Sequence, residues 1–187
     1  MIGICGDFMK LFLIIGLLVH AGFSEVAWKK IFNGVDETGW HSAGASVWKI
    51  IPGDSAIEGK GQNLAYTMFF TDRKDFDQFT MKYSYRLLAG CSGFFFRSEE
   101  TSGGAYVRGM QVEAKDGLRE AGSIYCHECG GWKRQHSQEW SQMVLKSADQ
   151  YNDVMLTVKE PNIYVNVNGH QAVGETEPSL LSAGAQQ

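Results

Sequence analysis

Hydrophobic and polar residues alternate strictly over residues 79–87. The apolar positions share one face of an extended chain, and they are Phe79, Met81, Tyr83, Tyr85 and Leu87. Alternation with a period of two residues indicates a β-strand that is buried on one side only. We therefore predict a strand over these residues, with its apolar face toward a core.

Further strands are predicted later in the chain. They cover residues 93–97, 106–113, 153–158 and 163–167. Asn168-Gly169 follows the last of them, and it is a preferred two-residue hairpin turn because both residues tolerate positive φ. One short helix is predicted within residues 137–148, where Trp140, Met143, Val144 and Ser147 share a face. Many short strands joined by Gly-rich turns predict a single all-β domain, an antiparallel sandwich.

The first 24 residues differ in kind from the rest of the chain. Lys10 precedes an apolar run of nine residues from Leu11 to Val19, and Gly22-Phe23-Ser24 supplies a small-residue exit. This order is typical of a secretory signal peptide, and the run is too short to span a bilayer, which needs about 20 residues. We predict a signal peptide over residues 1–24, with Met9 as an alternative start and a buried N-terminal helix as the alternative interpretation. The mature domain, residues 25–187, is then secreted or periplasmic and has no membrane span.

Composition and charge argue against one class of partner. The net charge is −4, and no run of Lys and Arg occurs. Because binding to phosphates needs clustered cations, this argues against nucleic acid as a partner.

Several short motifs, in order, resemble the 3-keto-disaccharide hydrolase family. They are Phe32-Asn33-Gly34, Gly39-Trp40, Ser92–Ser98 (SGFFFRS), Gly109–Glu113 (GMQVE), Gly122–Tyr125 (GSIY), Tyr151–Val154 (YNDV) and Asn168-Gly169. The resemblance covers roughly residues 28–173. It implies a concanavalin A-like jelly-roll β-sandwich and a carbohydrate ligand, and the fold agrees with the strand pattern. Family members normally continue past the Asn-Gly hairpin with two more strands, whereas residues 174–187 are short and polar, so we expect a jelly roll that lacks its last strands.

The alternation of side chains along the predicted strands 93–97 and 106–113 shows which polar residues share one face of the sheet. Gln111 and Glu113 share one face, and we expect Arg97 to meet them on the open face of a sheet, where a sugar lies in a jelly roll. Arg108 falls on the opposite face unless a bulge at Gly109 re-aims it. We name Gln111, Arg108, Tyr125 and Trp132 as substrate-binding candidates, the two aromatic residues as platforms for a sugar ring. The alternatives are that Tyr125 and Trp132 belong to the core and that Arg97 forms an ion pair with Glu113.

The predicted chemistry needs carboxylates. Two of them cleave a glycosidic bond when their surroundings separate their pKa values, and Glu113 and Glu128 are the pair we expect to face each other. The family name implies a particular route, in which a ketone at C3 acidifies the C2 proton so that a base removes it and the C1 substituent leaves. Arg97 or a bound divalent cation would then stabilise the enolate.

The segment Tyr125–Trp132, YCHECGGW, raises a separate question through its two cysteines. A disulfide, unpaired thiols, a metal site and a redox pair are all open at this stage. A single Cys-x-x-Cys is half of a structural zinc site, and a disulfide suits an exported protein, either Cys126–Cys129 or Cys91 with one of them. His127 and His136 have no recognised ligand spacing, so we expect exposed loop histidines and name no metal ligands.

Three functions remain compatible with the residues. The first is a secreted glycoside hydrolase that acts on 3-keto-disaccharides or related sugars. The second is a non-catalytic carbohydrate-binding module, because the same fold hosts lectins and fold does not fix function. The third is a structural or interaction domain.

Overall fold

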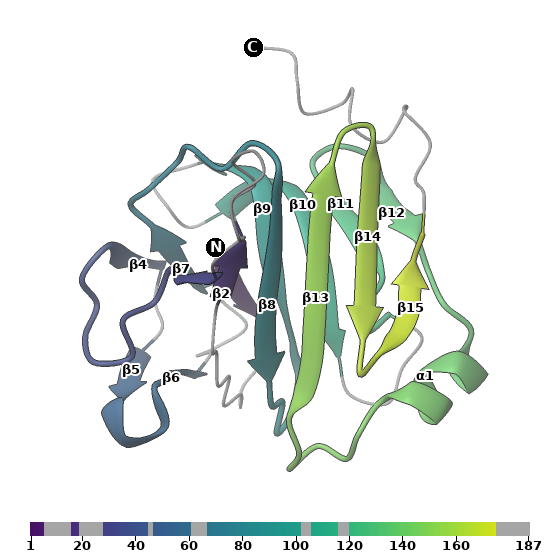
Figure 1. Cartoon of the computed structure of the whole chain (residues 1–187), viewed down its shortest axis with the longest axis horizontal. Coiled ribbons are helices and arrows are strands. Elements are labelled where there is room, and N and C mark those ends of the chain that lie inside the picture. The colour runs from purple at the N-terminus through teal and green to yellow at the C-terminus, as the bar shows by residue number, and fades with distance from the viewer. Residues whose placement is uncertain are drawn as a thin grey trace.

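Two antiparallel β-sheets lie face to face and account for most of the structure (Figure 1). The computed structural model describes residues 1–5, 16–18, 28–44, 47–60, 67–101, 106–115 and 120–174. Within them, sheet A has the strand order β12 (Gly131–Arg134), β11 (Ile124–His127), β10 (Tyr106–Lys115), β9 (Cys91–Thr101), β1 (Ile2–Cys5), β7 (Thr67–Thr71) and β4 (Trp40–Gly44). Sheet B has the order β15 (His170–Val173), β14 (Asn162–Val167), β13 (Asn152–Lys159), β8 (Phe79–Tyr85), β2 (Gly16–Leu18) and β3 (Trp28–Lys30). The predicted all-β sandwich is confirmed.

Smaller elements complete the described chain. A separate hairpin pairs β5 (Val47–Ile51) with β6 (Ala56–Lys60), and a short 3-10 helix, η1 (Pro52–Asp54), joins them. The α-helix α1 (Gln138–Val144) connects sheet A to sheet B. No described helix has the length and apolar character that a membrane crossing requires.

The main core lies between the two sheets, where the strand patterns predicted it. All five apolar residues of the 79–87 stretch are buried, from Met81 at 1% exposure to Phe79 at 7%. They meet residues of sheet A such as Phe94, Met110 and Ile124. The period-two prediction therefore identified the core face of β8 correctly.

The predicted Asn-Gly hairpin forms, and it also anchors the helix. Asn168 and Gly169 both have positive φ, at 50° and 83°. The Asn168 side chain donates to the carbonyl oxygen of Val144 at 2.8 Å, at the end of α1, and accepts from the backbone N–H of Asp153 at 2.9 Å. One side chain thus links the helix, β13 and the hairpin, which lie close together in Figure 1.

The predicted helix exists, but its buried face differs from the expected one. Val144 is buried as predicted, whereas Met143 is 68% exposed and the second buried position is Ser141. Ser137 caps the helix by accepting from the backbone N–H of Trp140 at 3.1 Å, which fixes where the first turn begins. The helix is only two turns long, so this start decides which side chains face the sheets.

Most of the segment predicted as a signal peptide lies outside the described residues. Within it, β1 lies between β9 and β7 of sheet A, and β2 lies between β8 and β3 of sheet B. Ile2 contributes to the core with 1% exposure. Cleavage after residue 24 stays a prediction, and it would take one strand out of each sheet. The expected absence of the last family strands concerns residues 175–187, which also lie outside the described residues.

Candidate active site

Four side chains in register form a row across the outer face of sheet A. Gln111 on β10 lies opposite Phe95 on β9 and opposite Tyr125 on β11, and Tyr125 lies opposite Trp132 on β12. Their neighbours along the strands, Met110 and Val112 among them, face the main core instead. Strand alternation therefore places an amide among three aromatic rings on the face away from the core.

Gln111 and His127 form the polar centre of this row. Nε2 of His127 and Oε1 of Gln111 are 2.6 Å apart, and Gln111 is only 6% exposed. Gln111 extends over Gly93 of β9, where an added Cβ would overlap its amide group. The absence of a side chain at position 93 is thus what gives Gln111 its place.

His127 lies among three aromatic rings. Its ring centroid is 4.7 Å from that of Tyr125, 5.0 Å from that of Phe95 and 6.1 Å from that of Tyr106. Burial lowers the pKa of His127, so its imidazole is neutral at pH 7. An amide oxygen only accepts hydrogen bonds, so Nε2 carries the proton and Nδ1 has a free lone pair. The expected exposed loop histidine is therefore wrong: His127 belongs to β11, and alternation from Tyr125 along this strand places it on the outer face of the sheet.

Glu113 lies on the same face, two residues beyond Gln111 along β10. Burial raises its pKa to about 8, Lys115 opposes this rise and Glu120 adds to it. The two neighbours also interact with each other, with 3.8 Å between Nζ of Lys115 and Oε1 of Glu120. Glu113 is therefore largely protonated at pH 7 and can act as a proton donor. Glu120, which no motif singles out, is the carboxylate that the structure brings near it.

The structure does not bring Glu128 to Glu113. Glu128 is exposed in the turn after β11, beyond the pair formed by His127 and Gly109. Glu113 is four positions from Gly109 along β10, or about 13 Å at 3.3 Å per residue. The expected facing pair of carboxylates does not form, because the antiparallel register sends the two residues to opposite ends of the hairpin.

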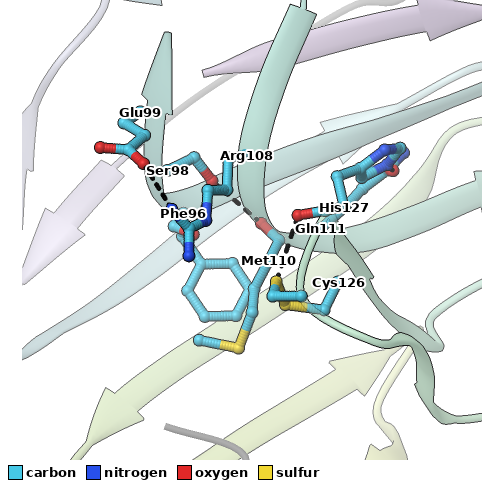
Figure 2. The surroundings of a disulfide bond; sticks show 9 residues. Phe96, Ser98, Glu99, Arg108, Met110, Gln111, Cys126 and His127 are labelled. Atoms are coloured by element: carbon cyan, nitrogen blue, oxygen red, sulfur yellow. Dashed lines mark hydrogen bonds and ion pairs between the residues drawn. A yellow bond between two sulfur atoms is a disulfide. The ribbon is translucent and has the colours of Figure 1, made fainter. Parts of the chain in front are cut away.

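The cysteines of the same turn are joined to each other. Cys126 and Cys129 form a disulfide, with a Cα–Cα distance of 5.2 Å, which selects one of the options left open by the sequence. Figure 2 shows Cys126 on the core side with Met110, whereas Gln111 and His127 lie on the other side of the strands. Cys91 is disulfide-bonded too.

The two arginines predicted for the site lie elsewhere. Arg97 has φ of 48° and forms an ion pair with Glu160, near sheet B, so it neither meets Gln111 nor pairs with Glu113. Arg108 lies 3.5 Å from Glu99 and on the same side of β10 as Met110 (Figure 2). The register changes between Arg108 and Met110, but the extra residue belongs to β9, so Arg108 keeps its side of the sheet.

The predicted aromatic platforms are found on the outer face, outside the main core. Trp132 is 39% exposed, and its ring centroid lies 5.0 Å from that of Tyr125 in an edge-on arrangement. Exposed rings beside buried polar groups match what a sugar offers, C–H groups on its faces and hydroxyls on its edges. The described part of the chain holds no group of three or more His, Cys, Asp or Glu that could bind a metal ion, so the expected option of a divalent cation has no ligand set there.

The comparison with known protein families supports the fold and a sugar as the ligand. No curated protein matches the chain. The family described as 3-keto-alpha-glucoside-1,2-lyase-like domain matches residues 27–186, which is most of the chain. The chain therefore belongs to this family of carbohydrate-active hydrolases, the 3-keto-disaccharide hydrolases that its motifs resemble.

Proposed function

We propose that this protein cleaves the glycosidic bond of 3-keto-glucosides on the outer face of sheet A. The observation that supports this most is Glu113, a largely buried carboxyl with a pKa of about 8 that lies on the same face as Gln111, two residues further along β10. A sugar ring stacked near Tyr125 and Trp132 and laid over Gln111 would lie between a neutral imidazole and a protonated carboxyl. That pairing of a base with an acid suits an elimination next to a ketone.

The proposed reaction begins with proton removal. Nδ1 of His127 takes the C2 proton, and the electrons of the C–H bond form a C2=C3 double bond while the C3 oxygen becomes an enolate. The amide N–H of Gln111 hydrogen-bonds to that oxygen. The enolate then collapses to a C3 ketone and a C1=C2 double bond, the C1–O bond breaks, and Glu113 protonates the departing oxygen.

Addition of water completes hydrolysis and restores both groups. The ionised Glu113 takes a proton from water as the hydroxyl bonds to C1, and His127 returns its proton to C2. The product is a 3-keto-sugar and a free alcohol. Each residue ends in the protonation state in which it began.

The test compares two carboxylates of the same hairpin. Glu113→Gln should lower kcat for release of glucose from a 3-keto-disaccharide by at least about 100-fold, the usual effect of losing one acid or base. Glu128→Gln, which changes an exposed carboxylate, should keep kcat within about twofold. Full activity in Glu113→Gln, together with loss of activity in Glu128→Gln, would show that Glu128 and not Glu113 is the catalytic carboxyl.

The pH profile gives an independent reading of both groups. On the acid side, kcat/KM should decrease below pH 6.5, where His127 with its lowered pKa becomes protonated. On the alkaline side, kcat/KM should decrease near pH 8, where Glu113 ionises. Binding of the sugar with no turnover by the wild type would instead favour the carbohydrate-binding module, for which Tyr125 and Trp132 would suffice.

A further inference from the structure

A cavity lined by aromatic rings opens beside the proposed sugar site. Its volume is about 600 Å³, within the range of roughly 300–1,000 Å³ that small-molecule sites usually have. Its aromatic lining consists of Phe70, Phe76, Phe79, Phe94, Phe95 and Phe96. The cavity lies beside the end of β1, where Met1 joins its lining between β7 and β9.

Phe95 connects this cavity to the catalytic groups. Its side chain lines the cavity, its ring centroid is 5.0 Å from that of His127, and it lies opposite Gln111 in register. A glycoside whose sugar lay over Gln111 would therefore reach the cavity by extending its C1 substituent across Phe95. Glu113 lies opposite Gly93 of the same strand β9, two residues from Phe95.

Several polar groups around the cavity are paired within the protein. The Thr71 hydroxyl donates to the carbonyl oxygen of Arg73, and the Ser98 hydroxyl donates to that of Phe96. The Arg73 guanidinium pairs with Asp75 and lies 4.8 Å from the ring of Phe76. The lining therefore offers rings more than free hydrogen-bonding groups, which suits a flat apolar group better than a second sugar.

We propose that this cavity binds the leaving group of the substrate and that the preferred leaving group is a neutral aromatic ring. The inference rests on the proposed function for its link to catalysis, since it assigns the C1 substituent of that reaction. It narrows the substrate class from disaccharides to aryl glucosides that carry the 3-keto group.

Binding of unoxidised sugars to the full chain tests the proposal without turnover. By titration calorimetry, phenyl α-glucoside should bind at least tenfold more tightly than methyl α-glucoside, which corresponds to about 1.4 kcal/mol. Phe76→Ala should reduce that ratio to less than threefold, because Phe76 is a half-buried ring of the cavity. Lys74→Ala, an exposed residue at the same cavity, should leave the ratio unchanged.

Phenol by itself separates failure of this inference from failure of the proposed function. Two results together support the cavity as the leaving-group site, even when 3-keto-glucosides are not turned over. The first is saturable binding of phenol that Phe76→Ala weakens. The second is the tenfold preference for the phenyl glucoside. Equal affinity for the two glucosides overturns the inference, whether or not phenol binds. Melting curves of both variants show that they are folded, and the wild-type comparison of the two glucosides needs no variant.

Discussion

Replacing Glu113 with Gln should change how the stability of this protein depends on pH. The folded-state pKa of Glu113 is about 8, raised from 4.5 chiefly by burial. A carboxyl whose pKa is higher in the folded state favours folding fully below pH 4.5, and this contribution is lost as the pH rises to about 8. Gln has no charge to bury, so the variant does not undergo that loss. The variant should therefore gain stability relative to the wild type between pH 4.5 and 8.

The size of the gain follows from the two pKa values. At 1.36 kcal/mol per pH unit, the difference between 4.5 and about 8 corresponds to at most about 5 kcal/mol. Because part of the Glu113 side chain still reaches solvent, we expect about 2–5 kcal/mol above pH 8. For a chain of this size, 1 kcal/mol shifts Tm by roughly 2–4 °C, so the effect is measurable by melting as well as by denaturant.

Urea unfolding followed by tryptophan fluorescence at intervals from pH 5 to pH 9 measures this difference. Subtracting the wild-type curve from that of Glu113→Gln cancels the titration of the other groups. Glu128→Gln is the matched control, and its difference from the wild type should stay within about 0.5 kcal/mol at every pH, as is usual for an exposed residue. A constant difference between Glu113→Gln and the wild type across this range would refute a buried, mostly protonated Glu113.

Three further predictions follow from other contacts. Gly93→Ala should displace Gln111 from beside His127, because the new Cβ would overlap the Gln111 amide. We expect kcat for the 3-keto-disaccharide to fall at least tenfold, with a small change in Tm. An unchanged kcat would remove Gln111 from the site. Asn168→Ala should lower the free energy of unfolding in urea by about 2–3 kcal/mol, because it removes the hydrogen bonds to Val144 and Asp153 and the side chain that favours positive φ. The control Gln171→Ala, on neighbouring β15, should lower it by less than about 1 kcal/mol. Equal losses of stability in the two variants would contradict this. Residues 25–187 expressed alone should melt below the full chain, because β1 with its buried Ile2 and β2 are absent, and an equal Tm would show that these strands add nothing to stability.

The strands were predictable because their signals are local. The alternation from Phe79 to Leu87 and the Asn168-Gly169 turn each depend on residues adjacent in sequence, and both are found as expected. Met143 was misplaced because the face of a two-turn helix depends on where its cap begins. The shared face of Gln111 and Glu113 also follows from a single strand, so it was predicted correctly.

The site as a whole depends on contacts that sequence spacing does not encode. The antiparallel register brings His127 to Gln111 and carries Glu128 away from Glu113, although 127 and 128 are neighbours in the chain. The extra residue in β9 and the positive φ of Arg97 turn that side chain toward Glu160. The sequence by itself determined the strands β8, β9, β10, β13 and β14, the faces of β8 and β10, and the family, because period, turn chemistry and motifs are local. Only the tertiary structure decided which polar groups meet, because that depends on strand register and burial, which also set the pKa of Glu113.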